Sequence, residues 1–260
     1  MEFEGQSAVV IGGATGIGSG ICRALAARGA RVHLCDIDPE GAEKLAADVG
    51  EGRIAVHPCD VTRVESLIAA EAAIRADGPV SLVFVNAGAI ALKPILESTP
   101  ADWQWLFEIN LFGTVKAIQA FLPGLLAQEV RSRLVVTSSV AALRTPPMSG
   151  QTMYMASKTA QLGLCNGLRT ELEGTKVDLS VIFPGAVRSA IRAKSETRRP
   201  GTIQITPPAN VSSTGYIEPE VAGERIIQEV IAGQPFITTH PGEGQLVRAM
   251  QDRIMRAFED

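Results

Sequence analysis

The sequence predicts an α/β fold: a doubly wound parallel sheet of about seven strands, with helices on both faces, in a single domain over residues 1–260. Short runs rich in Val, Ile and Leu alternate along the chain with longer runs that have helical spacing. The short runs are almost continuously apolar, which is typical of parallel strands buried on both faces. Right-handed crossovers between such strands produce a doubly wound sheet.

Each element has its own signal in the sequence. Strands are expected where the chain reads SAVVI (7–11), RVHLC (31–35), RIAVH (53–57), SLVFV (81–85), RLVVT (133–137), DLSVIF (178–183) and PFITT (235–239). Helical runs are expected over 18–28, 40–49, 62–76, 101–107, 111–126, 153–173 and 219–232, and an amphipathic run over 245–258 closes the series. Neither an internal repeat nor a linker divides these elements, so we expect one domain of the Rossmann type.

Residues 188–217 interrupt this alternation. The stretch is rich in Pro, Ser and Thr and carries five basic side chains, Arg188, Arg192, Lys194, Arg198 and Arg199. A long irregular insert in a compact domain is usually functional or disordered. Because it follows the sixth strand, we favour a lid over a ligand; the alternative is a solvated surface loop.

Composition and charge exclude several classes of function. Apolar residues make up 46% of the chain and charged residues 20%, as in ordinary globular proteins. The net charge of −4 and the pI near 5.5 argue against a nucleic-acid partner. No run approaches the roughly 18 apolar residues of a membrane span. The acidic start MEFEG lacks the features of a signal peptide, so we expect a cytoplasmic protein without a membrane partner.

The cysteines and histidines give no sign of a metal site or a hydrolase. The four cysteines form no CxxC pair, and no Cys or His cluster has metal spacing, so we expect no metal and buried thiols in a reducing compartment. No GxSxG motif accompanies the three histidines, which disfavours a Ser-His hydrolase.

The first strand runs directly into the glycine-rich stretch IGGATGIG at residues 11–18. Glycines there allow unusual backbone angles and let a pyrophosphate approach the N-terminus of the following helix. No GK[ST] follows, so the stretch is not a P-loop. We expect a dinucleotide to contact Gly12, Thr15, Gly16, Ile17 and Gly18.

Asp36 stands directly after the second strand, 18 residues beyond Gly18. That spacing is close to the roughly 20 residues expected for an acid that binds the adenosine ribose. A carboxylate there accepts hydrogen bonds from ribose hydroxyls and repels a 2′-phosphate, and the glycine stretch contains no Lys or Arg. The sequence therefore favours NAD over NADP; the alternative is a turn residue before Asp38 and Pro39.

Further motifs follow in order, and with the glycine stretch they resemble the short-chain dehydrogenase/reductase family in its compact form. They are Cys59-Asp60-Val61, Asn86-Ala87-Gly88, Asn110 in EINLFG, Ser139 in VVTSSV, the YxxxK pair Tyr154 and Lys158, and Pro184-Gly185 with Val187 and Ser189. The resemblance implies catalytic roles for Asn110, Ser139, Tyr154 and Lys158. It implies cofactor contacts from Asp60, Val61, Asn86, Ala87, Gly88, Tyr154, Lys158, Pro184, Gly185, Val187 and Ser189.

The chain departs from the family pattern in two places. The gap of 15 residues between Ser139 and Tyr154 is about two longer than usual, so the loop over 144–153 is expected to bulge. The C-terminal region reads PFITTHPGEGQLVRAM and lacks the glycine-rich ending that the family usually has.

Tyr154 and Lys158 lie four residues apart, which on a helix means the same face. A free phenol has a pKa near 10 and is a poor base at neutral pH, but a neighbouring ammonium group favours the phenolate. Taken alone, the pair could be an ordinary helix-surface contact. As the resemblance implies, Tyr154 exchanges the substrate proton, Lys158 binds the nicotinamide ribose, Ser139 orients the substrate oxygen, and Asn110 holds a water that links Lys158 to solvent.

These observations predict an NAD-dependent oxidoreductase that transfers hydride between a secondary alcohol or ketone and the nicotinamide. Apolar stretches near the site favour an alicyclic or aromatic small-molecule substrate; basic side chains at 188–199 leave open a carboxylate or phenolate on it. Two alternatives remain: a non-catalytic NAD-binding regulatory or scaffold protein, and an oxoacyl-type reductase, which would usually prefer NADP. The resemblance also implies a homodimer or homotetramer, paired through helices near 101–126 and 153–173.

Overall fold

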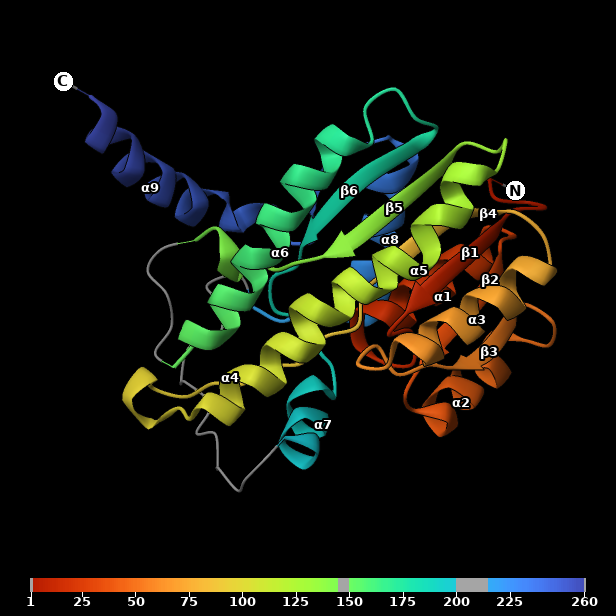
Figure 1. The fold of residues 1–260 in the computed structure, drawn as a ribbon, viewed down its shortest axis with the longest axis horizontal. Coiled ribbons are helices and arrows are strands. Elements are labelled where there is room, and N and C mark those ends of the chain that lie inside the picture. Colours follow the sequence, from red (N-terminus) through yellow and green to blue (C-terminus); the bar gives the residue numbers. More distant parts are fainter. Residues whose placement is uncertain (1, 145–149, 200–214, 260) are drawn as a thin grey trace.

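Seven parallel strands form one sheet in the order β3-β2-β1-β4-β5-β6-β7 (Figure 1). The structure is a computed structural model that describes residues 2–144, 150–199 and 215–259. The strands are β1 (Ser7–Ile11), β2 (Arg31–Asp36), β3 (Ile54–Pro58), β4 (Val80–Val85), β5 (Ser132–Thr137), β6 (Val177–Phe183) and β7 (Phe236–Thr238). The predicted doubly wound sheet is confirmed, and its order changes direction between β1 and β4.

One helical layer consists of α1 (Gly16–Ala27), α2 (Pro39–Val49) and α8 (Pro219–Ile231). Its buried side chains pack in one cluster with Val10 of β1 and Leu34 of β2. The helices α1 and α8 approach at backbone distance, because a methyl group at Gly20 would lie 1.8 Å from the carbonyl oxygen of Pro219. This close packing is possible only where glycine leaves the space free.

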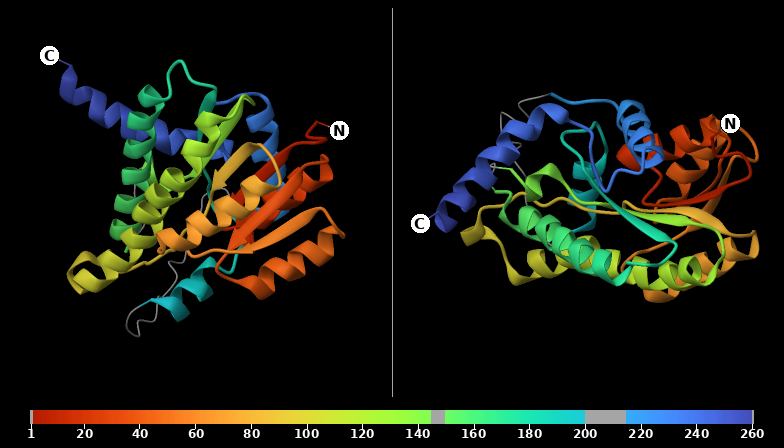
Figure 2. Two further views of the ribbon diagram at one scale, coloured as in Figure 1. Left: turned by 45° about the vertical axis from the view of Figure 1, so that its right-hand side comes forward. Right: turned by 90° about the horizontal axis from the view of Figure 1, so that it is seen from above.

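The other helical layer consists of α3 (Val64–Ala76), α5 (Gly113–Ala127) and α6 (Thr152–Glu171) and covers the opposite face of the sheet (Figure 2). Its buried side chains pack with Val9 and Ile11 of β1. Successive residues of β1 therefore serve opposite layers, as the alternation of side chains along a strand requires. This two-sided burial explains why the strand runs are almost continuously apolar.

Residues 100–127 form one helical run: α4 (Pro100–Phe107), a π-helical turn η2 (Glu108–Phe112) and α5. Thr99 and Asp102 start it with a capping box, in which each side chain bonds the other residue's backbone N–H. The run has 28 residues and contains an 18-residue stretch with a mean hydropathy of 1.3, enough by length and composition to cross a membrane. Ala117 and Phe121, however, pack into the core beside the sheet, so this is a core helix of the α/β domain.

The segment after β6 differs from the expected pattern, whereas the expected C-terminal helix is present. The segment 188–217 was expected to be irregular, but Ile191–Arg198 forms helix α7, and residues 200–214 lie outside the described part of the chain. Residues 145–149, which belong to the loop that was expected to bulge before Tyr154, also lie outside it. Helix α9 (Gly244–Met255) buries none of its residues and projects from the body of the domain (Figure 1).

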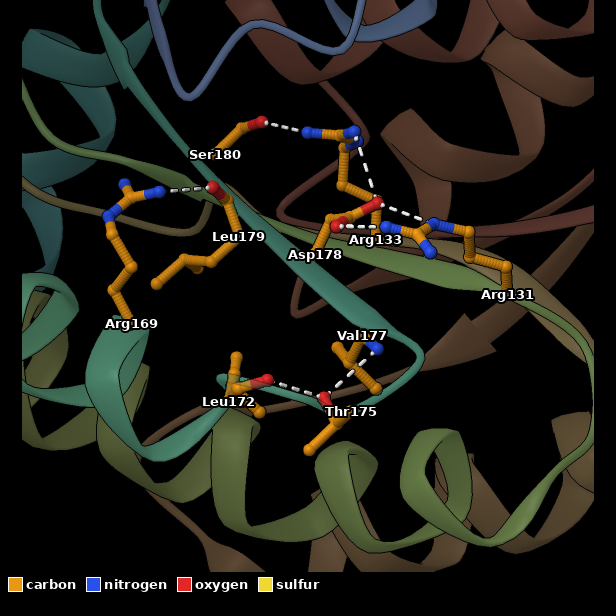
Figure 3. Close-up of polar contacts among 9 residues, drawn as sticks. All are labelled: Arg131, Arg133, Arg169, Leu172, Thr175, Val177, Asp178, Leu179 and Ser180. Atoms are coloured by element: carbon orange, nitrogen blue, oxygen red, sulfur yellow. Dashed lines mark hydrogen bonds and ion pairs between the residues drawn. The ribbon is translucent and has the colours of Figure 1, made fainter.

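The amino ends of β5 and β6 carry a charged cluster (Figure 3). Asp178 accepts hydrogen bonds from Nη2 and Nε of Arg131 at 2.8 and 3.0 Å and from Nη2 of Arg133 at 3.3 Å. Nη1 of Arg133 also donates to Oγ of Ser180 at 2.9 Å. The cluster joins neighbouring strands at the edge away from their carboxyl ends, so we assign it a structural role.

Candidate active site

A cavity of about 780 Å³ opens at the carboxyl ends of the strands. Residues that follow each of the strands β1 to β6 contribute to its lining. In a doubly wound sheet this edge, beside the point where the strand order changes direction, is where ligands bind. Of the cofactor and catalytic residues expected from the sequence, all but Gly18 and Asn110 line the cavity.

The glycine stretch forms a cradle that fits a dinucleotide phosphate. Gly12 has a φ of +83°, and a methyl group on it would lie 2.5 Å from Cα of Ala87. Gly16 has a φ of +57°, and a methyl group there would lie 2.7 Å from Cβ of Ser189. Side chains at either position would strain the backbone and fill the space.

The N-terminus of α1 also favours an anionic ligand. Thr15 precedes the helix in an extended conformation and makes no side-chain capping bond, and the first turn carries no acidic residue. The N–H groups and the dipole of this helix end are therefore suited to an anion. Gly18 contributes through packing, because a methyl group there would lie 2.0 Å from the carbonyl oxygen of Gly12.

Asp36 lies at the end of β2 in the cavity wall. Its two carboxylate oxygens accept hydrogen bonds from the backbone N–H groups of Ala14 and Asp38, each at 2.9 Å. These bonds hold the carboxylate beside the glycine cradle, where it can accept bonds from ribose hydroxyls. A carboxylate oxygen of Asp60, in contrast, accepts from N and Oγ1 of Thr62 and so orders its own loop.

The catalytic candidates meet on α6 and at the end of β5. Nζ of Lys158 donates to the carbonyl oxygen of Thr137 at 3.0 Å and lies 5.9 Å from the ring centroid of Tyr154. Oγ of Ser138 donates to the carbonyl oxygen of Lys158, which ties the helix to the strand. Oγ of Ser139 accepts from N of Ala141 at 3.1 Å and also interacts with the Tyr154 side chain.

Burial dominates the titration of this group. It lowers the pKa of Lys158 to about 7, because the ammonium form loses its hydration. Burial also raises the pKa of Tyr154, and the hydrogen bond with Ser139 lowers it only in part. On balance, burial decides the direction, and the pKa of Tyr154 lies above its ordinary value.

Asn110 lies inside the protein, in the π-helical turn η2. Its Oδ1 accepts from N of Ala89 at 2.8 Å, and its Nδ2 donates to the carbonyl oxygen of Ala89 and to Oγ of Ser157, each at 3.0 Å. Its carbonyl oxygen accepts from the side chains of Thr114 and Gln161. The structure thus gives Asn110 the geometry of a positioning residue that fixes the loop after β4 against α6.

Helix α7 contributes to the cavity wall, and two polar contacts hold it against loops that follow two different strands. Lys194 forms an ion pair with Asp38, which follows β2. Oγ of Ser195 accepts from N of Ile90, in the loop after β4, at 3.1 Å. Four other residues of α7 and its approach contribute to the lining, namely Ser189, Ile191, Arg192 and Arg198.

The segment after β6 supplies the remaining wall. Pro184, Gly185, Val187 and Ser189 line the cavity, as expected. A methyl group at Gly185 would lie 2.6 Å from the ring of His240, so this turn also needs a glycine. Within the described ranges, no group of three or more His, Cys, Asp or Glu side chains gathers as metal ligands would.

Sequence reasoning did not identify Trp105, Arg144 or Glu243 as cavity residues. Arg144 and Glu243 lie 99 positions apart and form a buried ion pair in the wall. Nothing in the local sequence of either residue indicates its partner. The one available signal was that Arg144 follows Ser139 by five residues.

The fold, the glycine cradle and the group formed by Ser139, Tyr154 and Lys158 define a dinucleotide-binding oxidoreductase. The chain belongs to the short-chain dehydrogenase family, whose model matches residues 6–200. The resemblance drawn from the sequence motifs is thereby confirmed.

Individual relatives support the family and differ in cofactor. Galactitol 2-dehydrogenase (L-tagatose-forming) of Cereibacter sphaeroides is 32% identical over 197 residues, which cover 76% of this chain and 77% of that protein. A short-chain dehydrogenase/reductase of Burkholderia phymatum in complex with NAD has a TM-score of 0.88 and 27% identity, covering 99% and 96% of the two chains. An alcohol dehydrogenase of Thermococcus sibiricus complexed with 5-hydroxy-NADP has a TM-score of 0.73 and 25% identity, covering 90% and 95%.

Proposed function

We propose that the protein is an NAD-dependent alcohol dehydrogenase or ketoreductase acting on a secondary alcohol or the matching ketone. The observation that carries this proposal is that Ser139, Tyr154 and Lys158 line the same cavity as the glycine cradle and Asp36. A dinucleotide held by the cradle and the strand ends would extend towards Tyr154 within one continuous space. A regulatory protein would not need that arrangement.

In this mechanism Tyr154 exchanges a proton with the substrate oxygen. During oxidation its phenolate accepts the hydroxyl proton, and during reduction its phenol returns one. The nicotinamide, when bound, supplies hydride chemistry and, in its oxidised form, a positive charge that favours the phenolate. Protonated Lys158 adds to that effect, and the Ser139 hydroxyl donates to the substrate oxygen and orients the carbinol carbon.

Asn110 acts indirectly in this proposal. Its bonds to Ala89 and Ser157 hold the loop after β4 and the catalytic helix α6 in register. Beside the water-binding role that the family resemblance implies, we propose this positioning role because both ends of the side-chain amide have protein partners. Asn110→Ala would then displace Tyr154 and Lys158 together.

The preference for NAD rests on Asp36. A 2′-phosphate beside this carboxylate would meet like-charge repulsion. Lys194 offers a cation nearby, but its ion pair with Asp38 already occupies it. One solved structure similar to this chain holds NAD and another holds 5-hydroxy-NADP, so the cofactor preference has to be measured directly.

The substrate is expected to have an apolar body. The cavity wall near the catalytic group includes Ile90, Trp105, Ile109, Val140 and Ala141. Such side chains favour an alicyclic or aromatic ring by removing its surface from water.

The test is a screen of the purified protein for NADH formation. Secondary alcohols from aliphatic to aryl would be offered with NAD and with NADP, and the matching ketones with the reduced cofactors, beside Tyr154→Phe. Turnover that prefers NAD and vanishes in the variant supports the proposal. Binding of NAD without turnover of any alcohol or ketone would favour the regulatory alternative instead.

We also propose that the protein works as a homo-oligomer in the cytoplasm. Phe112 is 50% exposed and Leu126 47% exposed on the α4–α5 run, a face suited to pairing. All four cysteines are free and buried, as suits a reducing compartment. Light scattering coupled to gel filtration would report a dimer or tetramer; a monomer would contradict the first point.

A further inference from the structure

A buried ion pair forms part of the cavity wall. Nη1 of Arg144 donates to Oε2 of Glu243 at 3.1 Å, and the two side chains are 8% and 2% exposed. Arg144 lies just beyond η3 (Val140–Ala142), the turn that begins at Ser139, and Glu243 ends the turn η4 (Pro241–Glu243) before α9. The pair therefore connects the catalytic loop to the C-terminal segment.

This connection does not use every donor of the Arg144 guanidinium. A second buried pair, Lys93 and Asp102, shows the structural case: Asp102 also accepts from N and Oγ1 of Thr99 and so starts α4, away from the cavity. In contrast, Nε of Arg144 is buried without a hydrogen-bond partner in the described protein. Burying a guanidinium N–H without a hydrogen-bond partner is costly, so a further partner for the Arg144 guanidinium is indicated.

We propose that Arg144 and Glu243 are the polar anchor of the substrate site and select secondary alcohols that carry a second, neutral hydroxyl group. This proposal rests on the proposed dehydrogenase function and specifies its substrate. A guanidinium only donates hydrogen bonds, and a carboxylate only accepts them. A hydroxyl group does both, so it can accept from Arg144 and donate to Glu243 at once.

The charge of the pair excludes the main alternatives. Arginine and glutamate together are neutral, so a substrate carboxylate would gain the attraction of Arg144 but meet the repulsion of Glu243. A secondary alcohol with no other polar group would cover the pair without giving the Arg144 guanidinium a further hydrogen-bond partner. With the apolar side chains Ile90, Trp105 and Val140 nearby, the favoured substrate has a ring or chain body with two hydroxyl groups.

A matched set of alcohols tests this on the wild-type protein. The set is 1-phenylethanol, the three derivatives of it with one hydroxyl group on the ring, 1-phenylethane-1,2-diol and 4-(1-hydroxyethyl)benzoate. We expect the best dihydroxy compound to exceed 1-phenylethanol by about tenfold or more in kcat/KM, mainly through KM, and to exceed the carboxylate as well. Equal efficiency for 1-phenylethanol and all dihydroxy compounds would overturn the proposal.

Two variants separate the anchor from a purely structural contact. Glu243→Gln leaves Arg144 with an uncompensated positive charge, so the benzoate should gain relative to the diols. Arg144→Met with Glu243→Met replaces the pair by apolar side chains of similar length, so the ratio between dihydroxy compounds and 1-phenylethanol should fall towards one. If both variants keep the wild-type ratios, the pair does not touch the substrate and the proposal fails.

The control is Asp178→Asn, in the charged cluster of Figure 3 at the amino ends of β5 and β6, which should leave the ratios unchanged. Ratios of kcat/KM remain readable even where a variant lowers the fraction of folded protein, because every substrate meets the same preparation. The two proposals can fail separately. Oxidation of 1-phenylethanol without any preference for a second hydroxyl would leave the dehydrogenase proposal intact and overturn the anchor, whereas no turnover of any alcohol or ketone would overturn the dehydrogenase proposal itself.

Discussion

Tyr154 and Lys158 share one side of α6, with Nζ of Lys158 at 5.9 Å from the Tyr154 ring centroid and anchored to the carbonyl oxygen of Thr137. The anchor fixes the lysine beside the phenol inside a buried environment. Burial raises the pKa of Tyr154, which keeps the phenol neutral, and lowers the pKa of Lys158 to about 7, so the lysine gains and loses its charge within the neutral range. Charge in this pair therefore depends on what else occupies the cavity.

Replacing Tyr154 by phenylalanine should lower kcat by about 10²–10⁴-fold, because it removes the proton donor and acceptor while keeping the ring. Steady-state kinetics measure the loss, and fluorescence titration with NADH should show that the cofactor still binds. Tyr216→Phe is the matched control, since this second tyrosine also lines the cavity but is 46% exposed and packs against Arg188 instead of Lys158. Equal losses in the two variants would contradict the assignment of Tyr154.

Replacing Asp36 by asparagine should weaken the preference for NAD. The amide can still accept a bond from Ala14, but it no longer repels a 2′-phosphate, so kcat/KM should fall with NAD and rise with NADP. The measurement is the ratio of the two kcat/KM values, which we expect to move by about tenfold, or about 1.4 kcal/mol. Asp48→Asn, which changes a surface pair with Arg23, is the control. A wild-type protein that already prefers NADP would contradict this reading of Asp36.

Replacing Lys194 by methionine should speed the release of NADH. The ion pair with Asp38 holds α7 over the cavity, and its loss leaves Ser195 and Ile90 as the described polar contact between α7 and the strand-end loops. A partly exposed ion pair contributes about 0.2–1 kcal/mol, so the dissociation rate should rise by a few fold. Stopped-flow fluorescence measures it. Lys176→Met removes an exposed pair with Glu129 and should leave the rate unchanged.

Replacing Gly20 by alanine should destabilise the fold by several kcal/mol or prevent folding. The added methyl group would lie 1.8 Å from the carbonyl oxygen of Pro219, so α1 and α8 would have to separate. Gly167→Ala on α6 is the opposite case, because a methyl group there meets nothing within 4 Å. An exposed helix position gains about 1 kcal/mol from that change. Urea unfolding of both variants would show whether the signs differ.

His33 predicts how stability depends on pH. Burial, with a smaller contribution from His57, lowers the pKa of His33 from 6.5 to about 4. The unfolded chain therefore binds a proton between these values that the folded chain does not, so stability is full above pH 6.5 and falls as the pH drops towards 4. His33 therefore contributes about 3 kcal/mol to the free energy of unfolding above pH 6.5, relative to its contribution below pH 4.

Urea unfolding at several pH values, for wild type and His33→Gln, measures this contribution. The variant should show a shallower loss of stability between pH 6.5 and 4. The remaining slope belongs to the carboxylates and to His57, whose pKa burial also lowers. Identical slopes in the two proteins would contradict the assignment to His33.

Local sequence was enough to predict the sheet, because burial on both faces demands continuous apolar strands and only regular alternation with helices gives parallel order. It was also enough for residues whose role depends on their own backbone or immediate spacing, such as Gly12, with its positive φ, and the pair Tyr154 and Lys158 on one helical face. Such features depend only on residues that are neighbours in the sequence.

Tertiary structure alone decided which distant groups meet and how buried they are. It joined Arg144 to Glu243 and Lys194 to Asp38, turned Asn110 inward onto Ala89, and ordered α7 against the cavity. It also decided that burial raises the pKa of Tyr154, because desolvation depends on every neighbour in space and not only on the residue four positions along the helix.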